Sequence, residues 1–317
     1  MTLLGRSDLD VFPLALGGNV FGWTADRDAS FRILDAFTEG GGDFIDTADV
    51  YSAWVPGNSG GESETILGEW LAARRPRDVV IATKVSQHPE FRGLSAKNVR
   101  AAAEASLKRL GVDTIDLYYA HFDDENTPLE ETVAAFGQLV ADGLVRHTAV
   151  SNYSADRIRT WIRIAQDAGT AVPVVVQPHY NLVHRNDVEE SIIPVAEEFG
   201  LGLVPYYALA SGFLTGKYRS EDAGAVASAR AGGAAKYATA HGLRIIDELE
   251  RIGRAHGASV ASVALAWLRA QPTVVAPIAS ASRVEQVEDL LQSVRIQLSA
   301  EEVASLSAVS AWTPANA

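Results

Sequence analysis

Short apolar runs alternate along the chain with longer stretches in which apolar residues recur every three or four positions. The runs are rich in β-branched and aromatic residues, which is typical of buried strands. The helical spacing is clear at Val99, Ala103 and Leu107. The pattern predicts strands at residues 14–18, 43–48, 79–85, 114–122, 147–152, 174–180, 202–209 and 274–280, and helices near 29–39, 62–74, 96–110, 129–142, 155–168, 187–199 and 260–270.

Eight strands alternating with helices in a chain of 317 residues predict an α/β fold of the (β/α)8 (TIM) barrel type. A doubly wound open sheet is the alternative. Against it, the first strand lacks a G-x-G-x-x-G turn, and polar strand ends are spread over all eight strands rather than gathered at one switch point. No linker-like segment divides the chain, so we expect one domain over residues 1–317.

Two segments outside the alternation carry their own predictions. The stretch LLGRSDLDVFPL at residues 3–14 predicts an N-terminal β-hairpin, with short apolar arms around a turn at residues 5–8, and such a hairpin would close the bottom of a barrel. The Ala/Gly-rich segment at residues 223–235 predicts a mobile loop rather than a packed element.

A polar residue stands at the end of each predicted strand. In a (β/α)8 barrel, the active site is built at the C-terminal ends of the strands, with residues drawn from several of them. One polar residue after an apolar run is ordinary, but a series of eight strand ends with acid/base groups predicts a catalytic site. The residues are Asn19, Asp46, Lys84, His121, Ser151, Asn152, Gln177, Tyr206 and Ser280.

Lys84 is the most specific of these signals, because it lies within the apolar run VVIATKV and a lysine is rarely buried without a partner. Asp46, at the end of the preceding strand, is a suitable partner. Tyr51 follows Asp46 by five residues. We expect the Lys84 ammonium to lower the pKa of this phenol and make Tyr51 a general acid. The alternatives are a purely structural ion pair, or a Schiff-base amine at Lys84, for which a neighbouring carboxylate is unsuitable.

His121 ends an aromatic strand and is a candidate to polarise a substrate carbonyl; a hydrogen-bonded core histidine is the alternative. Asp123 and Asp124 follow it, but there is no early His-x-His, so no metal is expected. The chain has no G-x-S-x-G elbow, and Asp46 alone does not provide the carboxylate pair of a glycosidase.

The amino-acid composition limits the kinds of partner that the protein can bind. The chain carries 27 basic and 40 acidic residues, a net charge of −13, which argues against a nucleic-acid partner. It has no cysteine, so disulfides, thiolate metal centres and thiol nucleophiles are excluded. The N-terminal sequence does not resemble a signal peptide, and no apolar run is long enough to span a bilayer, so we expect a cytoplasmic protein without a membrane partner. The pattern does not predict an oligomeric state.

Redox chemistry at such a site needs a bound cofactor, and a nicotinamide or a flavin is the expected source of hydride. The amide and hydroxyl groups of Ser151, Asn152 and Gln177 suit a carboxamide, and Tyr206 offers a flat ring for stacking. The small-residue loop 208–218, with Lys217, suits a pyrophosphate. Near the start of a helix at Val284, a further phosphate position is formed by Ser280, Ser282 and Arg283.

Taken together, the motifs resemble those of the aldo-keto reductase family. They are FIDTADVYS, GGESETILGEWL, IATK, IDLYYAH, VSNYS, QPHYNL and LASGFLTGKY, in this order. The resemblance implies a (β/α)8 barrel, NADPH as cofactor, and reversible reduction of an aldehyde or ketone. It implies that Tyr51 donates the proton, that Lys84 and Asp46 tune it, and that His121 orients the carbonyl. The implied cofactor contacts are Ser151, Asn152 and Gln177 at the carboxamide, Tyr206 on the nicotinamide, Leu209, Ser211, Leu214 and Lys217 at the pyrophosphate, and Gln286 and Asp289 near the adenosine.

The chain departs from the family pattern at the adenosine end. Asp289 stands where the family usually carries Asn, and Ser282 occupies the position of an expected basic residue, with Arg283 one step further on. Arg283 is therefore our candidate for the NADPH 2′-phosphate.

The sequence predicts the substrate-binding residues less specifically than the cofactor-binding residues. Trp23, Trp54 and Phe122 are expected to wall a pocket for an apolar carbonyl compound, or else simply to cover the barrel mouth. The resemblance also includes nicotinamide-binding sensor or regulatory subunits with little turnover, and this is the alternative function.

Overall fold

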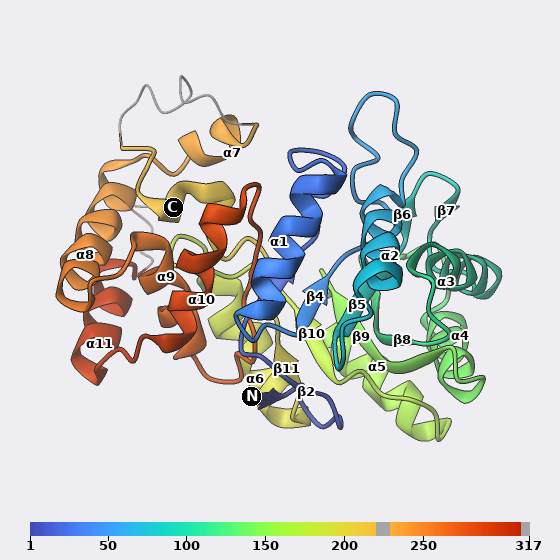
Figure 1. Cartoon of the computed structure of the whole chain (residues 1–317). Helices are drawn as coiled ribbons and strands as arrows, with labels where there is room; N and C mark the ends of the chain where they lie inside the picture. The colour runs from blue at the N-terminus through green and yellow to red at the C-terminus, as the bar shows by residue number, and fades with distance from the viewer. Residues whose placement is uncertain (220–228, 312–317) are drawn as a thin grey trace.

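The computed structural model describes residues 1–219 and 229–311. In these residues, eight parallel strands form one sheet (Figure 1). The first seven pair in chain order, and the last one pairs with the first. All eight predicted strands are confirmed, although most are shorter than the apolar runs that predicted them. They are β3 (Ala15–Gly17), β4 (Phe44–Asp46), β5 (Val80–Val85), β8 (Ile115–Ala120), β9 (Val145–Ser151), β10 (Val175–Gln177), β11 (Gly202–Leu203) and β12 (Ile278–Ala279).

Backbone hydrogen bonds between the seventh and eighth strand segments close the sheet into a barrel. The N–H of Leu203 donates to the carbonyl of Thr273, and the N–H of Val275 donates to the carbonyl of Leu203, both at 2.8 Å. Further up, Ile278 donates to the carbonyl of Pro205 at 2.8 Å. With β12 paired to β3 on its other side, the fold is a (β/α)8 barrel.

Helices cover the outside of the barrel, and the seven predicted ones are confirmed to within two residues at each end (Figure 1). One of them begins as a π-helical turn, because Pro194 has no N–H to donate to the preceding turn. The helices are α1 (Arg27–Glu39), α2 (Glu62–Arg74), α3 (Ala96–Leu110), α4 (Leu129–Ala141), α5 (Ala155–Asp167), the π-helical η1 (Val188–Ile192) with α6 (Ile193–Phe199), α8 (Ala240–His256), α9 (Val260–Arg269), α10 (Val287–Arg295) and α11 (Ala300–Val309).

The loop prediction for residues 223–235 is wrong at its C-terminal end. Ala231–Ala235 forms a short helix, α7, in which Ala231 and Ala234 are buried. Its small side chains allow it to pack closely against η2 (Ala210–Thr215), a short 3₁₀ segment after β11. Residues 223–228 of the predicted loop lie outside the described residues.

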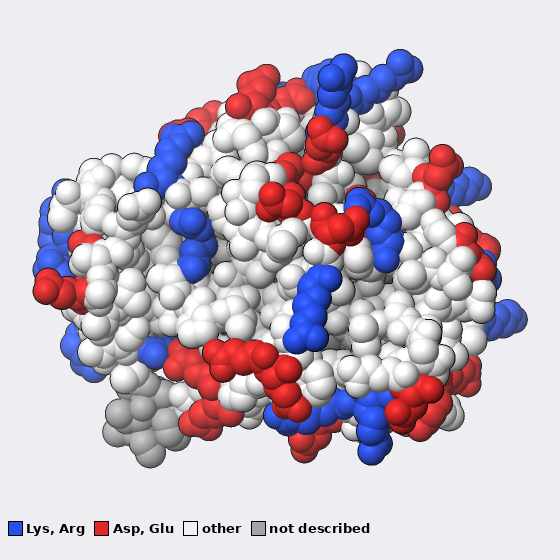
Figure 2. Space-filling view, turned by 90° about the horizontal axis from the view of Figure 1, so that it is seen from below, with Lys and Arg blue, Asp and Glu red and all other residues white. Residues whose placement is uncertain are grey.

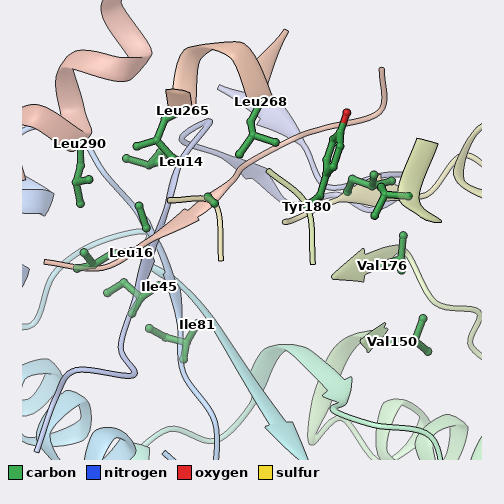
Figure 3. Packing of buried hydrophobic residues seen from close by; sticks show 14 of the residues in the cluster. Leu14, Leu16, Ile45, Ile81, Val150, Val176, Tyr180, Leu265, Leu268 and Leu290 are labelled. Atoms are coloured by element: carbon green, nitrogen blue, oxygen red, sulfur yellow. The ribbon is translucent and has the colours of Figure 1, made fainter. Parts of the chain in front are cut away.

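Two buried layers hold the barrel together. The interior layer combines small and branched side chains from alternate strand positions, including Ala15, Phe44 and Leu117. The outer layer lies between strands and helices, where Leu16, Ile45 and Ile81 meet residues such as Leu265 of α9 and Leu290 of α10 (Figure 3). This alternation along each strand leaves the strand ends as the place for polar groups.

The N-terminal hairpin closes the bottom of the barrel, as predicted. Its arms are β1 (Thr2–Leu3) and β2 (Asp10–Val11), and Leu4, Leu9 and Val11 are at most 2% exposed within the interior layer. Gly5 has φ +56°, and a Cβ there would lie 2.1 Å from the carbonyl oxygen of Val174, so the turn requires glycine. The face seen from below carries acidic and basic side chains interspersed (Figure 2).

Candidate active site

A cavity of about 420 Å³ opens at the C-terminal ends of the strands. Most of the predicted site residues meet there, although they come from all parts of the chain. Lys84 lies behind the lining, fully buried. Trp23, Leu214, Arg283 and Asp289 are not among the lining residues. The predicted residues that line the cavity are Asp46, Tyr51, Trp54, His121, Phe122, Ser151, Asn152, Gln177, Tyr206, Leu209, Ser211, Lys217, Ser280, Ser282 and Gln286.

Lys84 is held by three acceptors. Its Nζ donates to Asp46 Oδ2 at 2.6 Å and to the carbonyl of Thr47 at 2.7 Å. The third bond, at 3.0 Å, goes to the Tyr51 hydroxyl oxygen. An ammonium has three N–H groups and each finds an acceptor here, which indicates a charged side chain. Burial lowers the pKa of Lys84, and Asp46 opposes that effect. A buried, charged amine is unsuitable for Schiff-base chemistry.

The predicted direction of the Tyr51 pKa is wrong. Burial raises the pKa of Tyr51 well above its usual value, and the Asp46 carboxylate raises it further. These two effects outweigh the nearby ammonium, since Asp46 neutralises Lys84. Tyr51 is therefore a protonated phenol at neutral pH. Because its oxygen accepts from Lys84, its own hydrogen is available to a group in the cavity.

His121 lies beside Tyr51, with ring centroids 6.1 Å apart. Burial lowers the pKa of His121 well below its usual value, and the Lys84 charge lowers it further. The imidazole is therefore neutral and can donate one hydrogen bond. Its Nδ1 is buried without a hydrogen-bond partner among the described residues. A neutral ring at the cavity wall can polarise a carbonyl oxygen without carrying charge itself.

The last residues of β9 and β10, together with residues that follow β9 and β11, form a connected polar network. Tyr206 donates its hydroxyl hydrogen to Asn152 Oδ1 at 2.7 Å, and Asn152 Nδ2 donates to the carbonyl of His121 at 2.9 Å. Asn152 Nδ2 also donates to Ser151 Oγ, and Gln177 Nε2 donates to Asp46 Oδ1 at 2.9 Å. The amide of Asn152 thus links the ring of Tyr206 to the strand that carries His121.

Two imidazoles support Tyr206 from behind. The rings of His179 and His184 are stacked, with centroids 3.9 Å apart and planes 11° apart. His179 in turn stacks on Tyr206 at 5.4 Å and 26°. The ring of Tyr206 is therefore fixed both by this stack and by its hydrogen bond to Asn152.

The loop after β11 turns sharply beside the cavity. Ser211 and Gly212 have φ of +57° and +91°, and the N–H of Gly212 donates to the carbonyl of Leu209 at 2.8 Å. Lys217 lines the same part of the cavity and makes no ion pair within the described chain. Leu214, by contrast, is fully buried in the outer layer, where it packs beneath this loop.

On the opposite side, β12 contributes a second polar wall. Ser280 Oγ donates to Asn19 Oδ1 at 2.7 Å, and the hydroxyls of Ser282 and Thr24 are 2.9 Å apart. Gln286 accepts the backbone N–H groups of Ser282 and Arg283, so its side chain organises the start of η4 (Val284–Gln286). The side chain of Arg283 is exposed, and Asp289 is exposed on α10.

Aromatic side chains surround the mouth of the cavity. Trp54 and Phe122 are 48% and 40% exposed although they line it. Trp23 packs edge-on against Trp54 at 5.7 Å, so it supports the rim from outside the lining.

Three hydrogen-bonding side chains of the lining were not assigned to the site from the sequence: Thr24, Tyr207 and Arg230. Asn19 was predicted as a strand end, without a role of its own. Arg230 is the single charged residue of the Ala/Gly-rich segment 223–235, and this was the one sequence feature that could have indicated a role in the site. Its Nη2 donates to Asn19 Oδ1 at 3.1 Å, and its guanidinium lies over Trp23 at 5.7 Å. Thr24 and Tyr207 carried no separate signal beyond their neighbours.

Within the described residues, no helix is both long and apolar enough to cross a membrane.

Comparison with known proteins identifies the family of this chain. The model of the Aldo/keto reductase family matches residues 13–311. The chain is 36% identical to the uncharacterized oxidoreductase YrpG of Bacillus subtilis, over 95% of this chain and 92% of that protein. It is 33% identical to a probable voltage-gated potassium channel subunit beta of Oryza sativa subsp. japonica (92% and 90% covered). It is 31% identical to norsolorinic acid reductase A of Aspergillus parasiticus (92% and 76% covered).

The fold and the cavity at the strand ends define the class of protein, a (β/α)8 barrel with a polar site at the C-terminal ends of its strands. The family match then identifies the family. The chain belongs to the aldo/keto reductase family. The family and its oxidoreductase relatives support a carbonyl-reducing oxidoreductase.

Proposed function

We propose that this protein is an NADPH-dependent reductase of aldehydes or ketones, with Tyr51 as the proton donor. The observation that carries the proposal is the triple hydrogen bonding of Lys84. It uses all three ammonium N–H groups, and one of them is donated to the Tyr51 oxygen at 3.0 Å. This arrangement leaves the phenol hydrogen of Tyr51 for a substrate oxygen in the cavity.

The residues present suit a nicotinamide cofactor, which the family uses, usually as NADPH. The loop at Ser211 and Gly212 lines the cavity together with Lys217 and Arg230, whose positive charges suit a pyrophosphate. Tyr206 presents a ring that is already fixed in place. A carboxamide would be bound by Gln177 and by Asn152 Oδ1, since the amide nitrogen of Asn152 is already used. When bound, the nicotinamide supplies a hydride to the carbonyl carbon.

The protein's own residues then stabilise and neutralise the negative charge that develops on the carbonyl oxygen. Neutral His121 donates a hydrogen bond to this oxygen, and Tyr51 transfers its proton to it. The resulting phenolate keeps its hydrogen bond from Lys84, whose charge stabilises it. Asp46 holds Lys84 in the geometry for this step. In the direction of alcohol oxidation, the same phenolate acts as the base.

The proposed acid is tested by Tyr51→Phe. Nicotinamide absorbance is followed with NADPH and an aromatic aldehyde, and cofactor binding is measured separately by fluorescence. We expect cofactor affinity within about twofold of wild type and turnover reduced by about 10²-fold or more, the range for removal of a general acid. Near-normal turnover in Tyr51→Phe would refute the role of Tyr51. Absence of turnover in the wild type, despite tight cofactor binding, would refute the reductase.

The cofactor preference is tested separately at Arg283. We propose that its exposed guanidinium reaches the 2′-phosphate of NADPH. Arg283→Ala should then weaken NADPH binding and leave NADH binding unchanged, and Arg295→Ala, which removes an exposed cation at the far end of α10, is the control. If the ratio of NADPH affinity to NADH affinity is unchanged in Arg283→Ala, this assignment is refuted.

A nicotinamide-binding regulatory protein is the second candidate function. The observation that favours it is the 33% and 32% identity to proteins named as probable voltage-gated potassium channel subunits beta. Tight cofactor binding combined with turnover well below one per minute, across a panel of aldehydes and ketones, would favour this function over the first.

A further inference from the structure

We propose that Tyr207 is a specificity-determining residue whose ring forms one wall of the carbonyl site and favours planar aromatic carbonyl compounds over saturated ones. This inference rests on the proposed reductase function and deepens it. Tyr207 lies in the loop after β11, directly after the ring proposed to stack on the nicotinamide.

Exposed apolar side chains concentrate at the cavity. Six large hydrophobic side chains are exposed in the part of the chain that the structure describes. Three of them, Trp54, Phe122 and Tyr207, line this one cavity although they follow three different strands. Tyr207 is the most exposed of the three, at 53%. Exposed apolar surface gathered around a concave site indicates an apolar occupant.

The backbone of Tyr207 is strained. Its φ is +52°, in the left-handed region that a bulky side chain rarely adopts. Its carbonyl is held in place by two donors, Asn181 Nδ2 at 2.9 Å and the N–H of Ala210 at 2.7 Å. Strain of this kind persists where surrounding bonds impose it, and it is concentrated at functional sites. Here its effect is to direct a tyrosine ring into the lining of the cavity.

Ring contacts on the protein side fix the orientation of Tyr207. Its centroid lies 5.2 Å from that of Tyr206 and 5.1 Å from that of His179, the latter in an edge-on arrangement. Tyr207 and the proposed proton donor Tyr51 line the same cavity. A substrate whose carbonyl reaches Tyr51 therefore extends past the Tyr207 ring.

The chemistry of this wall favours flat aromatic carbonyl compounds. Aromatic rings in contact gain energy beyond the burial of their area, whereas a saturated ring of similar size gains only the burial. The expected discrimination is about three- to tenfold in affinity for one such contact.

The test uses 2-naphthaldehyde and cyclohexanecarbaldehyde as probes, bound to the full-length protein loaded with NADP⁺ so that no turnover occurs. Binding is followed by tryptophan fluorescence. In Tyr207→Ala, we expect 2-naphthaldehyde to bind three- to tenfold more weakly and cyclohexanecarbaldehyde to change less than twofold. Tyr207→Phe should behave as wild type, and the NADP⁺ affinity should stay within twofold in both variants.

Two controls keep the outcome interpretable. Leu3→Ala removes an equally exposed side chain (54%) at the other end of the barrel and should change neither affinity. Tyr207→Asn removes the ring while tolerating a positive φ, so it replaces the alanine variant if that one fails to fold. Equal weakening of both aldehydes, or no weakening of either, overturns the inference. Naphthaldehyde binding that depends on Tyr207 in a protein without turnover refutes the reductase but supports this inference.

Discussion

Lys84 shows how a charge is accommodated inside the barrel at the scale of single residues. It is fully buried, and its ion pair with Asp46 is also almost completely shielded from solvent. Two charges removed from water remain stable together only when their hydrogen bonds are complete, as they are here through Thr47 and Tyr51. The catalytic geometry and the stability of this region therefore depend on the same bonds.

Lys84→Met is predicted to be strongly destabilising. It leaves Asp46 buried without its cation, and loss of one partner from a buried pair costs about 3–5 kcal/mol of unfolding free energy. Urea denaturation at pH 7 measures the change. The control is Arg159→Met, which breaks an exposed pair with Glu198 (39% and 46% exposed) and should cost less than about 1 kcal/mol. Similar small losses in both variants would show that Lys84 contributes little to stability.

The sequence was informative about which residues gather but not about how they titrate. Lys84 and Asp46 could be paired because each ends a strand, and adjacent parallel strands end side by side. The pKa of Tyr51 could not be deduced in this way, since it depends on burial and on Asp46 neutralising the ammonium. Likewise, spacing did not reveal that Asn152 uses its amide to join Tyr206 and His121.

At the scale of elements, the eight strands and seven of the helices were predictable, whereas the helices α7, α8 and α11 and the irregular turns were not. Apolar runs located all eight strands, because barrel strands are buried on both faces. The short helix α7 was missed, since Ala and Gly without a clear period resemble a loop. The π-helical turn η1 also lacks a signal in periodicity, because it adds a residue to an otherwise ordinary helix.

The His179–His184 stack joins the segment after β10 to the ring that follows β11, and it predicts a pH dependence of stability. Burial lowers the pKa of His179 to about 3, with further lowering by His184. Below about pH 6.5 the unfolded chain binds a proton that the folded chain does not. The stabilisation is therefore complete above that pH and is lost as the pH falls toward 3.

His179→Phe keeps a ring in the stack and removes this titration. Between pH 7 and pH 5, we expect wild type to lose about 1 kcal/mol more unfolding free energy than His179→Phe, after allowance for partial exposure of the ring. Urea unfolding at both pH values measures the difference. His241→Phe is the control for a partly exposed histidine outside the stack. Parallel pH profiles for wild type and His179→Phe would contradict the prediction.

At the scale of the whole molecule, the end closed by the hairpin lies opposite the end that carries the proposed catalytic groups. The hairpin closes one end with Leu4, Leu9 and Val11 in the interior layer, while every proposed catalytic group lies at the other end. Loops at the strand C-termini are thus free to vary around a fixed interior. Arg230 and Tyr207 lie in such loops, because neither belongs to a regular strand or helix.

Leu9→Ala tests this separation. Leu9 is 2% exposed, so its truncation leaves a cavity in the interior layer and should lower the unfolding free energy by about 2–5 kcal/mol. Leu3→Ala, in the same hairpin but 54% exposed, should change it by less than about 0.5 kcal/mol. In both variants, the cofactor affinity of the folded protein should stay within twofold of wild type. A loss of cofactor affinity in Leu9→Ala that exceeds this limit would show that the plugged end is coupled to the site, because packing would then be transmitting a change along the full height of the barrel.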